Sequence, residues 1–183
     1  MTNLEKMLKG EYYYADDKQL VELRRMAKDL CLSFNSEVDP LLRNEKLKKL
    51  LGSFKGEFKF TPSIHFDYGF NVHLGANFYA NANLVILDGA KVSFGDNVFI
   101  APNCGVYTAI HPLDPKERNK GLEKALAVTI GNNVWIGGGV NILPGVKIGD
   151  NSTIGAGSVV TKDIPADVLA FGNPCKVIRK LWH

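Results

Sequence analysis

The stretch from Val128 to Asp163 reads VTIGNN, VWIGGG, VNILPG, VKIGDN, STIGAG and SVVTKD when it is divided into blocks of six residues. One column of these blocks holds the large aliphatic residues Ile130, Ile136, Ile142, Ile148, Ile154 and Val160. A second column holds mostly smaller residues: Val134, Val140, Val146, Ser152, Ser158 and Ile164. A six-residue period fits neither a helix, whose period is 3.6, nor a simple strand, whose period is 2.

This period is typical of a chain that makes a short strand, turns a corner and repeats. Three such sides close a triangular coil, and the coils must stack because a single coil leaves its edge hydrogen bonds unmade. The aliphatic column then fills the axis, while glycine and asparagine supply the corner conformations. An accidental run of glycine-rich strands in a β-sandwich is disfavoured, because six successive blocks keep their phase.

The same period continues upstream, through the residues Leu74, Ala80, Ile86 and Val92 and then Phe94, Ile100 and Val106. The phase slips by two between Val92 and Phe94, so we expect a small bulge there. The β-helix is therefore predicted to span residues 58–165. One excursion, residues 111–127, carries no six-residue period and contains two prolines, and irregular insertions of this length are usually functional or disordered.

The two ends of the chain do not follow the repeat. Residues 1–57 are predicted to be helical, with a stop at Gly10, an N-cap at Asp17 and a further helix that begins at Pro40. Residues 166–183 are expected to form a short loop and a helical end.

Composition and charge exclude several classes of protein. The chain has 183 residues with a formal net charge of +3, which suits an anionic cofactor but falls short of a nucleic-acid-binding protein. Its apolar runs are too short for a transmembrane helix or a secretion signal, so we expect no membrane partner and a cytoplasmic location. Three widely spaced cysteines predict neither a disulfide framework nor a zinc site.

Among the histidines His65, His73, His111 and His183, His111 stands out because it lies where the repeat ends and the excursion begins. A rigid platform beside a loop is a favourable place for a reactive group, and a neutral imidazole can accept a proton. Asn81 and Asn83 are either corner asparagines or hydrogen-bonding side chains at the coil surface.

Other polar and aromatic residues are candidates for ligand binding. The aspartates Asp16, Asp17 and Asp67 could accept hydrogen bonds from a polyol, and a late group of basic residues (Lys162, Lys176, Arg179 and Lys180) could bind a phosphate-bearing ligand. Trp135 lies outside both inward columns, so we expect it to be exposed on the wall of the prism or packed at a subunit contact.

Several motifs together resemble the maltose and galactoside O-acetyltransferases, most closely the maltose type. They include GEYYYADDKQL (10–20), NFYANANL (77–84), the hexapeptides themselves and YTAIHPLDPKERNKG (107–121). The resemblance implies a left-handed parallel β-helix that forms a homotrimer with sites between subunits. It also implies transfer of an acetyl group from acetyl-CoA to a sugar hydroxyl, without a metal, by direct attack and with His111 as general base.

The resemblance also implies roles for residues that match the family's motifs. Asn81 would lie at the active site, near both acceptor and cofactor. The acceptor would be bound by the acidic residues Asp16 or Asp17, Asp67 and Asp88, together with Asn81. Acetyl-CoA would contact Asn81, Ala101, Trp135, Gly138, Ala156, Thr161, Lys162, Lys176 and Arg179.

The sequence departs from the galactoside enzymes at two positions, one that would contact acetyl-CoA and one that would contact the acceptor. Gly138 replaces a serine, so a contact there would use the backbone, and Gly89 replaces an acidic acceptor residue beside Asp88, which disfavours a galactoside. Three alternatives remain: an acetyltransferase for another hydroxyl or amino acceptor, a metal enzyme of the γ-carbonic anhydrase type, and an inert sugar-binding β-helix. The metal enzyme is disfavoured because the sequence contains no closely spaced histidine pair.

Overall fold

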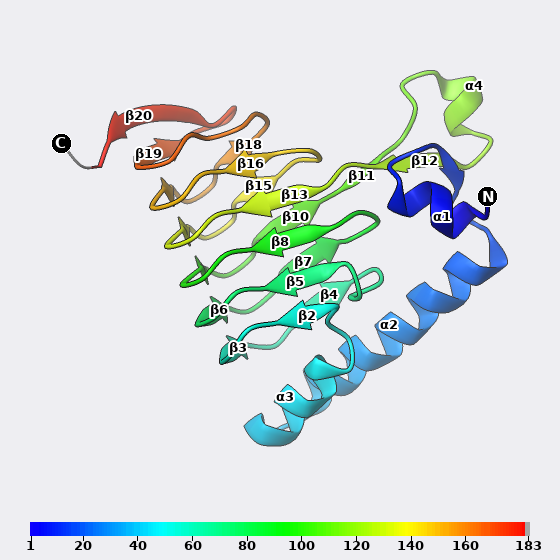
Figure 1. The fold of residues 1–183 in the computed structure, drawn as a ribbon, viewed down its shortest axis with the longest axis horizontal. Helices are drawn as coiled ribbons and strands as arrows, with labels where there is room; N and C mark the ends of the chain where they lie inside the picture. Colours follow the sequence, from blue (N-terminus) through cyan, green and yellow to red (C-terminus); the bar gives the residue numbers. More distant parts are fainter. Residues whose placement is uncertain (182–183) are drawn as a thin grey trace.

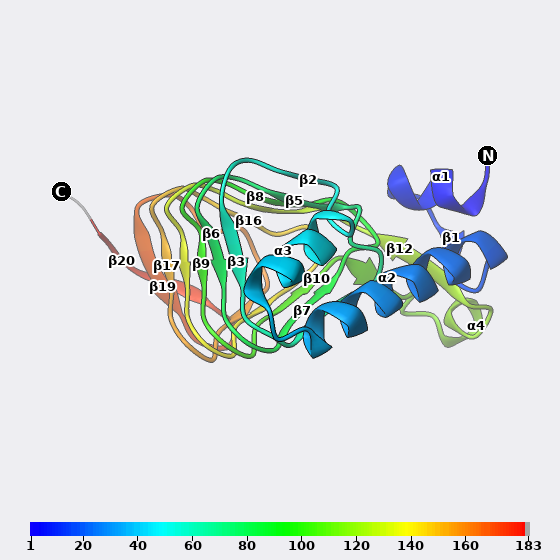
Figure 2. The same cartoon turned by 90° about the horizontal axis from the view of Figure 1, so that it is seen from below.

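The computed structural model describes residues 1–181, and most of these residues form a prism of three parallel β-sheets, or walls (Figures 1 and 2). Wall 1 consists of β2 (Ser53–Phe54), β5 (Val72–Leu74), β8 (Val92–Phe94), β13 (Val128–Ile130) and β16 (Lys147–Ile148). Wall 2 consists of β3 (Phe58–Phe60), β6 (Phe78–Ala80), β9 (Phe99–Ile100), β14 (Trp135–Ile136), β17 (Thr153–Ile154), β19 (Val168–Phe171) and β20 (Lys176–Lys180). Wall 3 consists of β4 (Ile64–Phe66), β7 (Leu84–Leu87), β10 (Gly105–Tyr107), β15 (Asn141–Ile142) and β18 (Val159–Val160).

The chain visits walls 1, 2 and 3 in turn, so the prism has three edges, which we name 1–2, 2–3 and 3–1 after the walls that they join. The strands of each coil bury the predicted aliphatic column, for example Ile136, Ile142 and Ile148, at 1–2% exposure. The hexapeptide prediction is confirmed by this packing. The β-helix begins earlier than the predicted boundary at residue 58, because Ser53–Phe54 already pairs with β5 in wall 1.

The predicted bulge between Val92 and Phe94 is wrong. Both residues point inward from the same strand, β8, and both are buried. Strands of successive coils pair at a spacing of 20 residues early in the chain (Tyr79 with Phe99) and of 18 later (Thr129 with Lys147). The two extra residues lie at edge 3–1, in the corners 67–71 and 88–91, and the excursion leaves the prism at the same edge.

Edge 1–2 is stabilised by a ladder of side-chain amides that we call the asparagine ladder: Asn77, Asn97, Asn133 and Asn151, with Asp167 as its last member. All five residues have a positive φ of 55–61°, which asparagine and aspartate tolerate better than most residues. Each amide nitrogen donates to the side-chain oxygen of the next member at 2.8–3.0 Å, and the last acceptor is the Asp167 carboxylate.

Three helices precede the prism, as predicted: α1 (Asn3–Leu8), α2 (Lys18–Ser36) and α3 (Pro40–Lys48). Asp17 caps α2, and Pro40 occupies the first turn of α3. The helices α2 and α3 cover the first coil, where Phe34 and Leu47 join the prism core. Asn35 pairs with the outer edge of β4 through two hydrogen bonds to the Ile64 backbone, at 2.8 and 2.9 Å.

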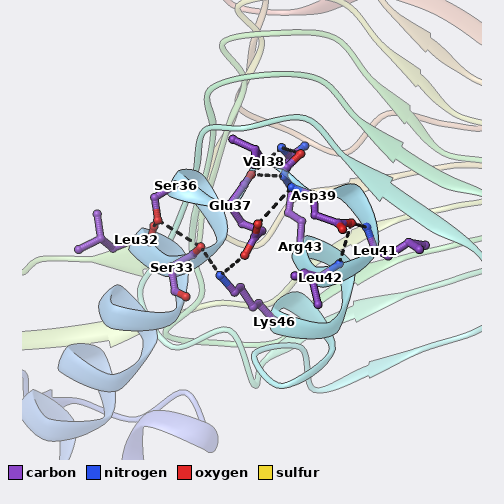
Figure 3. Close-up of polar contacts among 10 residues, drawn as sticks. All are labelled: Leu32, Ser33, Ser36, Glu37, Val38, Asp39, Leu41, Leu42, Arg43 and Lys46. Atoms are coloured by element: carbon purple, nitrogen blue, oxygen red, sulfur yellow. Dashed lines mark hydrogen bonds and ion pairs between the residues drawn. The ribbon is translucent and has the colours of Figure 1, made fainter.

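The turn between α2 and α3 is held by polar contacts that converge on Glu37 (Figure 3). Lys46 donates to the Glu37 carboxylate at 2.8 Å and to the Ser33 carbonyl at 3.1 Å, while the guanidinium of Arg43 donates to the Glu37 carbonyl. This turn therefore fixes the angle at which the two helices lie across the end of the prism.

The excursion is more ordered than its sequence indicates. It contains α4 (Pro115–Arg118) and β12 (Leu122–Ala125), and β12 pairs antiparallel with both β1 (Tyr13–Tyr14) and β11 (Ala109–Ile110). This three-stranded sheet joins the N-terminal segment to edge 3–1 (Figure 1).

The predicted helical end of the chain is wrong. Residues 168–180 form a β-hairpin, in which β19 continues wall 2 beside β17 and β20 returns antiparallel to β19. Val168 and Ala170 alternate inward as in a further coil, and Gly172, with a φ of 110°, lies in the turn. The open edge of β19 thus determines the structure of the tail. Residues 182–183, including His183, lie outside the described residues.

Candidate active site

His111 lies at the base of the excursion, directly after β11, and its side chain is exposed. Its Nδ1 atom lies 3.4 Å from the carbonyl oxygen of Leu122 in the neighbouring strand β12. Because a carbonyl oxygen only accepts hydrogen bonds, this contact favours, for the neutral ring, the tautomer with the proton on Nδ1. The lone pair of Nε2 is then available to accept a proton from a bound molecule.

Beside this histidine, edge 3–1 contains a cavity of about 250 Å³, which we call the edge pocket. It is lined by Tyr13, Ala15, Arg24, Lys28, Asp67, Tyr68, Gly89 and Glu123. Arg24 comes from α2 and donates to the Tyr68 hydroxyl at 2.7 Å and to the Ala15 carbonyl. These contacts hold the guanidinium across one side of the pocket.

Two partly buried carboxylates face the edge pocket. Burial raises the pKa of Asp67 above its ordinary value, although the positive charges of Arg24, His65 and Lys28 oppose the shift. Burial likewise raises the pKa of Glu123, and the charge of His111 is the main opposing influence. Carboxylates and an arginine around a small cavity can accept and donate hydrogen bonds to a polyhydroxylated molecule.

The other predicted acidic residues have different surroundings. Asp17 accepts at Oδ1 from the backbone nitrogens of Gln19 and Leu20, which caps α2, and at Oδ2 from the side-chain amide of Asn3. Asp16 is exposed near the end of the small sheet.

Asp88 is fully buried, and this burial is at odds with its predicted role in acceptor binding. Its carboxylate accepts hydrogen bonds from the backbone nitrogens of Tyr68 and Asn71 at 2.9 and 3.3 Å. Burial raises its pKa to about 6, more strongly than these bonds lower it. Asp88 therefore holds two corners of edge 3–1 together, and we do not include it among the acceptor contacts proposed below.

Edge 2–3 brings together five of the residues predicted to contact acetyl-CoA. Asn81, Ala101, Gly138 and Ala156 follow strands of wall 2 in successive coils, and Trp135 is 57% exposed on that wall, as predicted. Asn81, Ala101 and Trp135 line a cavity of about 450 Å³ together with Tyr79, Phe99 and Ile100. Asn83 has a φ of 63° and is a corner residue.

Asn81 is not among the residues of positive φ. Its side-chain oxygen accepts from the backbone nitrogen of Ala82 at 2.7 Å. No partner for its amide nitrogen occurs within residues 1–181, so this group is available to donate to a ligand.

The remaining predicted cofactor contacts lie elsewhere. Thr161 and Lys162 follow β18 at edge 3–1, the edge that carries His111, while Lys176 and Arg179 lie on β20. All four side chains are exposed. In a three-sided prism an edge is opposite the wall that does not meet it, so edge 3–1, where His111 lies, is opposite wall 2 in one chain. Figure 2 shows β12 of the excursion on the side of the prism away from wall 2. The structure thus divides the predicted site residues into two separate groups.

Sequence reasoning missed six residues of the edge pocket: Tyr13, Ala15, Arg24, Lys28, Tyr68 and Glu123. Tyr13 stands in the motif GEYYYADDKQL, and Tyr68 directly follows the predicted site residue Asp67, which are the signals that could have indicated them. Nothing in the sequence indicates that Glu123 faces Tyr13, because this pairing arises only when β12 folds back onto β1.

Residues 1–181 also lack features that two other classes of function require. They contain no cluster of three or more histidine, cysteine, aspartate or glutamate residues that could hold a metal ion. His65 and His73 lie on walls 3 and 1, and His73 Nδ1 is hydrogen-bonded to Ser53 at 2.8 Å. Over the same residues, no helix has the length and apolar character needed to cross a membrane.

Comparison with known proteins agrees with this geometry. Residues 6–56 match the family model described as the maltose acetyltransferase hexapeptide capping motif, and residues 127–162 match the bacterial transferase hexapeptide model, with six repeats. A Saccharomyces cerevisiae protein named as an acetyltransferase is 55% identical over 181 residues, which cover 97% of this chain and 92% of that protein.

Solved structures extend the likeness to the whole fold. A maltose O-acetyltransferase from Clostridium difficile 630 superposes with a TM-score of 0.97 at 50% identity, over 100% of this chain and 99% of that one. A galactoside acetyltransferase in complex with coenzyme A superposes with a TM-score of 0.95 at 43% identity, over 99% and 92% of the two chains. The predicted left-handed parallel β-helix is confirmed, and the chain belongs to the maltose/galactoside O-acetyltransferase family of hexapeptide-repeat acetyltransferases.

Proposed function

We propose that this acetyltransferase moves an acetyl group from acetyl-CoA to a hydroxyl of a glucose- or maltose-like sugar, with His111 as general base. The observation that carries the proposal is the exposed imidazole, its Nδ1 directed at the Leu122 carbonyl, beside a small pocket lined by two carboxylates and an arginine. A base that is already in the correct tautomer needs no rearrangement before it accepts a proton.

The proposed reaction is a direct transfer. The sugar hydroxyl attacks the thioester carbonyl while its proton moves to Nε2 of His111, and the thiolate of coenzyme A then leaves and takes up that proton. The bond from the acetyl carbon to sulfur breaks as the bond to the sugar oxygen forms, so atoms and charges balance. Cys104 is no candidate nucleophile, because it is 3% exposed and its Sγ lies 3.2 Å from the Gly137 carbonyl oxygen.

We further propose that the active site lies between chains of a homotrimer. One chain provides edge 3–1, with His111, Asp67, Thr161 and Lys162, and its neighbour provides edge 2–3, with the column from Asn81 to Ala156. Support for this arrangement comes from the separation of the two groups in a single chain and from the exposed aromatic side chains of wall 2. Closed rings of identical contacts are the usual way in which such complementary edges pair.

Residues of this chain fit the chemistry of acetyl-CoA. The small residues Ala101, Gly138 and Ala156 leave room for an extended chain along edge 2–3, with Trp135 beside it. Lys162, Lys176 and Arg179 are exposed cations near the C-terminal end, and they are suitable partners for the nucleotide phosphates. The galactoside acetyltransferase that superposes on this chain was solved with coenzyme A bound.

A cytoplasmic location fits the cysteines. Cys31, Cys104 and Cys175 are all unpaired and buried, as is usual in a reducing compartment.

The proposal is tested with acetyl-CoA, a panel of sugars and a thiol reagent that detects released coenzyme A. Acceptor-dependent release is expected with glucose or maltose, and His111→Ala should lower the rate ~10²–10⁴-fold without changing the circular dichroism spectrum. A wild-type protein that releases coenzyme A with no sugar, or a His111→Ala variant with a near-normal rate, would refute it. Light scattering tests the trimer, which has three times the 20.1 kDa mass of one chain.

A further inference from the structure

The excursion that begins at His111 has almost no apolar core of its own. No residue between 112 and 120 is buried, and Leu113 is 94% exposed. Its helix α4 is a single turn of four residues, which is too short to be stable by itself. Hydrogen bonds within the excursion therefore determine where its two ends lie, and His111 is attached to the first of these ends.

One side chain, that of Arg118, joins the two ends of the excursion. Its Nη1 atom lies 3.3 Å from the carbonyl oxygens of both Pro112 and Leu113, in the segment that leaves the prism. This terminal guanidinium nitrogen carries two hydrogens, so it can donate to both carbonyls. The backbone carbonyl of Arg118 accepts from the nitrogen of Gly121 at 3.0 Å, in the turn that returns to β12. Arg118 thus fixes the outgoing segment to the returning one.

The imidazole of His111 depends on the distance between the same two segments. The paired positions of β11 and β12 end at Ile110 and Lys124, so His111 and Leu122 lie beyond the last pair. Their contact, at 3.4 Å from Nδ1 to the carbonyl oxygen, is longer than the usual range of about 2.7–3.2 Å for an N–H···O hydrogen bond. A small further separation of the two segments would therefore break this contact.

Arg118 acts one residue away from each side of this contact. Pro112 directly follows His111, and Gly121 directly precedes Leu122. No other side chain among residues 1–181 donates a hydrogen bond to the outgoing segment at Pro112 or Leu113. The spacing between the imidazole and the Leu122 carbonyl is therefore most sensitive to this one guanidinium.

Resting on the function proposed above, we propose that Arg118 is a positioning residue for His111. Its guanidinium holds the outgoing segment near β12, which keeps Nδ1 at the Leu122 carbonyl and leaves the lone pair of Nε2 free to accept the proton of the sugar hydroxyl. When the guanidinium is removed, the ring takes up other rotamers and tautomers, and fewer molecules present a base in the correct state. A misplacement of about 1 Å in an active site can lower a rate ~10²-fold.

The test uses Arg118→Met, which keeps an extended side chain and removes every donor, together with Arg118→Ala. Lys120→Ala is the matched control, because it removes one positive charge from the same excursion, where Lys120 pairs with Glu117 at 2.7 Å. Circular dichroism checks the fold, and kcat and KM are measured for acetyl-CoA and for glucose. Both Arg118 variants should lower kcat about 10–100-fold and leave the KM for acetyl-CoA within about twofold of wild type, while Lys120→Ala keeps the wild-type values.

Two further readouts separate positioning from a merely structural role. In a double-mutant cycle, Arg118→Met should change the residual rate of His111→Ala less than about twofold, because it acts through an imidazole that is no longer there. Nitrogen NMR of the His111 ring, at a pH where the ring is neutral, should show the proton mainly on Nδ1 in the wild type and a mixture of both tautomers in the Arg118 variants.

The proposal is overturned if the Arg118 variants keep the wild-type kcat or leave the tautomers of His111 unchanged. It is also overturned if they raise the KM for acetyl-CoA instead, which would indicate a contact with the cofactor. If Arg118→Ala fails to fold, Arg118→Met decides, and failure of both variants to fold would itself refute a role confined to His111. Failure of the proposed function has a different result, namely no acceptor-dependent release of coenzyme A by the wild type, and the NMR comparison still tests Arg118 in that case.

Discussion

Two inactive variants of this chain are expected to restore each other when they assemble together. His111→Ala damages edge 3–1 and leaves edge 2–3 intact, whereas Asn81→Ala removes the available amide at edge 2–3 and leaves the histidine in place. Ala156→Trp, at an exposed position of the same edge, is a bulkier alternative that blocks the path of the pantetheine. In a trimer whose sites each combine edge 3–1 of one chain with edge 2–3 of the next, some sites of a mixed assembly receive both intact halves.

The size of the recovery follows from this geometry. When the two chains mix at random in equal amounts, a site is intact if its first edge comes from the Asn81 variant and its second from the His111 variant. Each condition is met half of the time, so about a quarter of the sites should be active in a closed ring of identical contacts. The His111 variant alone should retain about 1% or less, because a general base contributes ~10²–10⁴-fold.

The assay denatures the two variants together, refolds them, and measures coenzyme A release against separately refolded controls. Mixing after refolding should give no recovery until subunits exchange, which is the matched control. If both variants are inactive alone and the co-refolded mixture stays at the level of the controls, each site lies within one chain and the shared-edge arrangement is wrong.

Three further predictions concern stability, and each is measured by denaturant unfolding at one fixed protein concentration. Ile142→Ala, at an inward position with 1% exposure, should lower the free energy of unfolding by about 2–5 kcal/mol, and a loss below about 1 kcal/mol would contradict close packing along the axis. Asn133 has a φ of 55° and bonds to Asn97 and Asn151, so Asn133→Ala should be about 1 kcal/mol less stable than Asn133→Gly, and equal stabilities would contradict a backbone cause. Burial raises the pKa of Asp88 from 3.8 in the unfolded chain to about 6 in the folded protein, so the folded state binds this proton more tightly. The stability that results is fully present below the unfolded pKa and is lost as the pH rises through the folded pKa. The stability of the wild type relative to Asp88→Asn should therefore fall by about 3 kcal/mol between about pH 3.5 and pH 7, and a constant difference would contradict the shift.

The walls of the prism could be predicted because the direction of each side chain is a local property of a six-residue repeat. Ile136 and Ile142 point inward for the same reason, whatever lies elsewhere in the chain. The corners of edge 3–1 could not be predicted in this way. Their extra residues are held by Asp88, whose carboxylate reaches back to the backbone of Tyr68 and Asn71, and such a contact between coils leaves no periodic signal.

The residues of the candidate site differ in the same way: some could be located from the repeat, and others are placed only by contacts between distant parts of the chain. His111 could be found because it marks the end of a repeat, and Trp135 because it falls outside the inward columns. Glu123 lies in a segment without a period, and its surroundings depend on strands from two distant parts of the chain. The structure of the tail could not be predicted, because the apolar pair Val177 and Ile178, between basic residues, fits a helix or a strand equally well.

The two closed ends of the prism have a consequence beyond the single molecule. A stack of parallel coils presents bare backbone at its first and last turn, and identical stacks could in principle grow upon one another into endless fibres. Asn35 occupies the bare edge of β4 at one end, and at the other β20, with its three positive charges, runs against the direction of the coils. These two features disfavour end-to-end growth, and the walls and edges along the length of the prism stay open to contact with other chains.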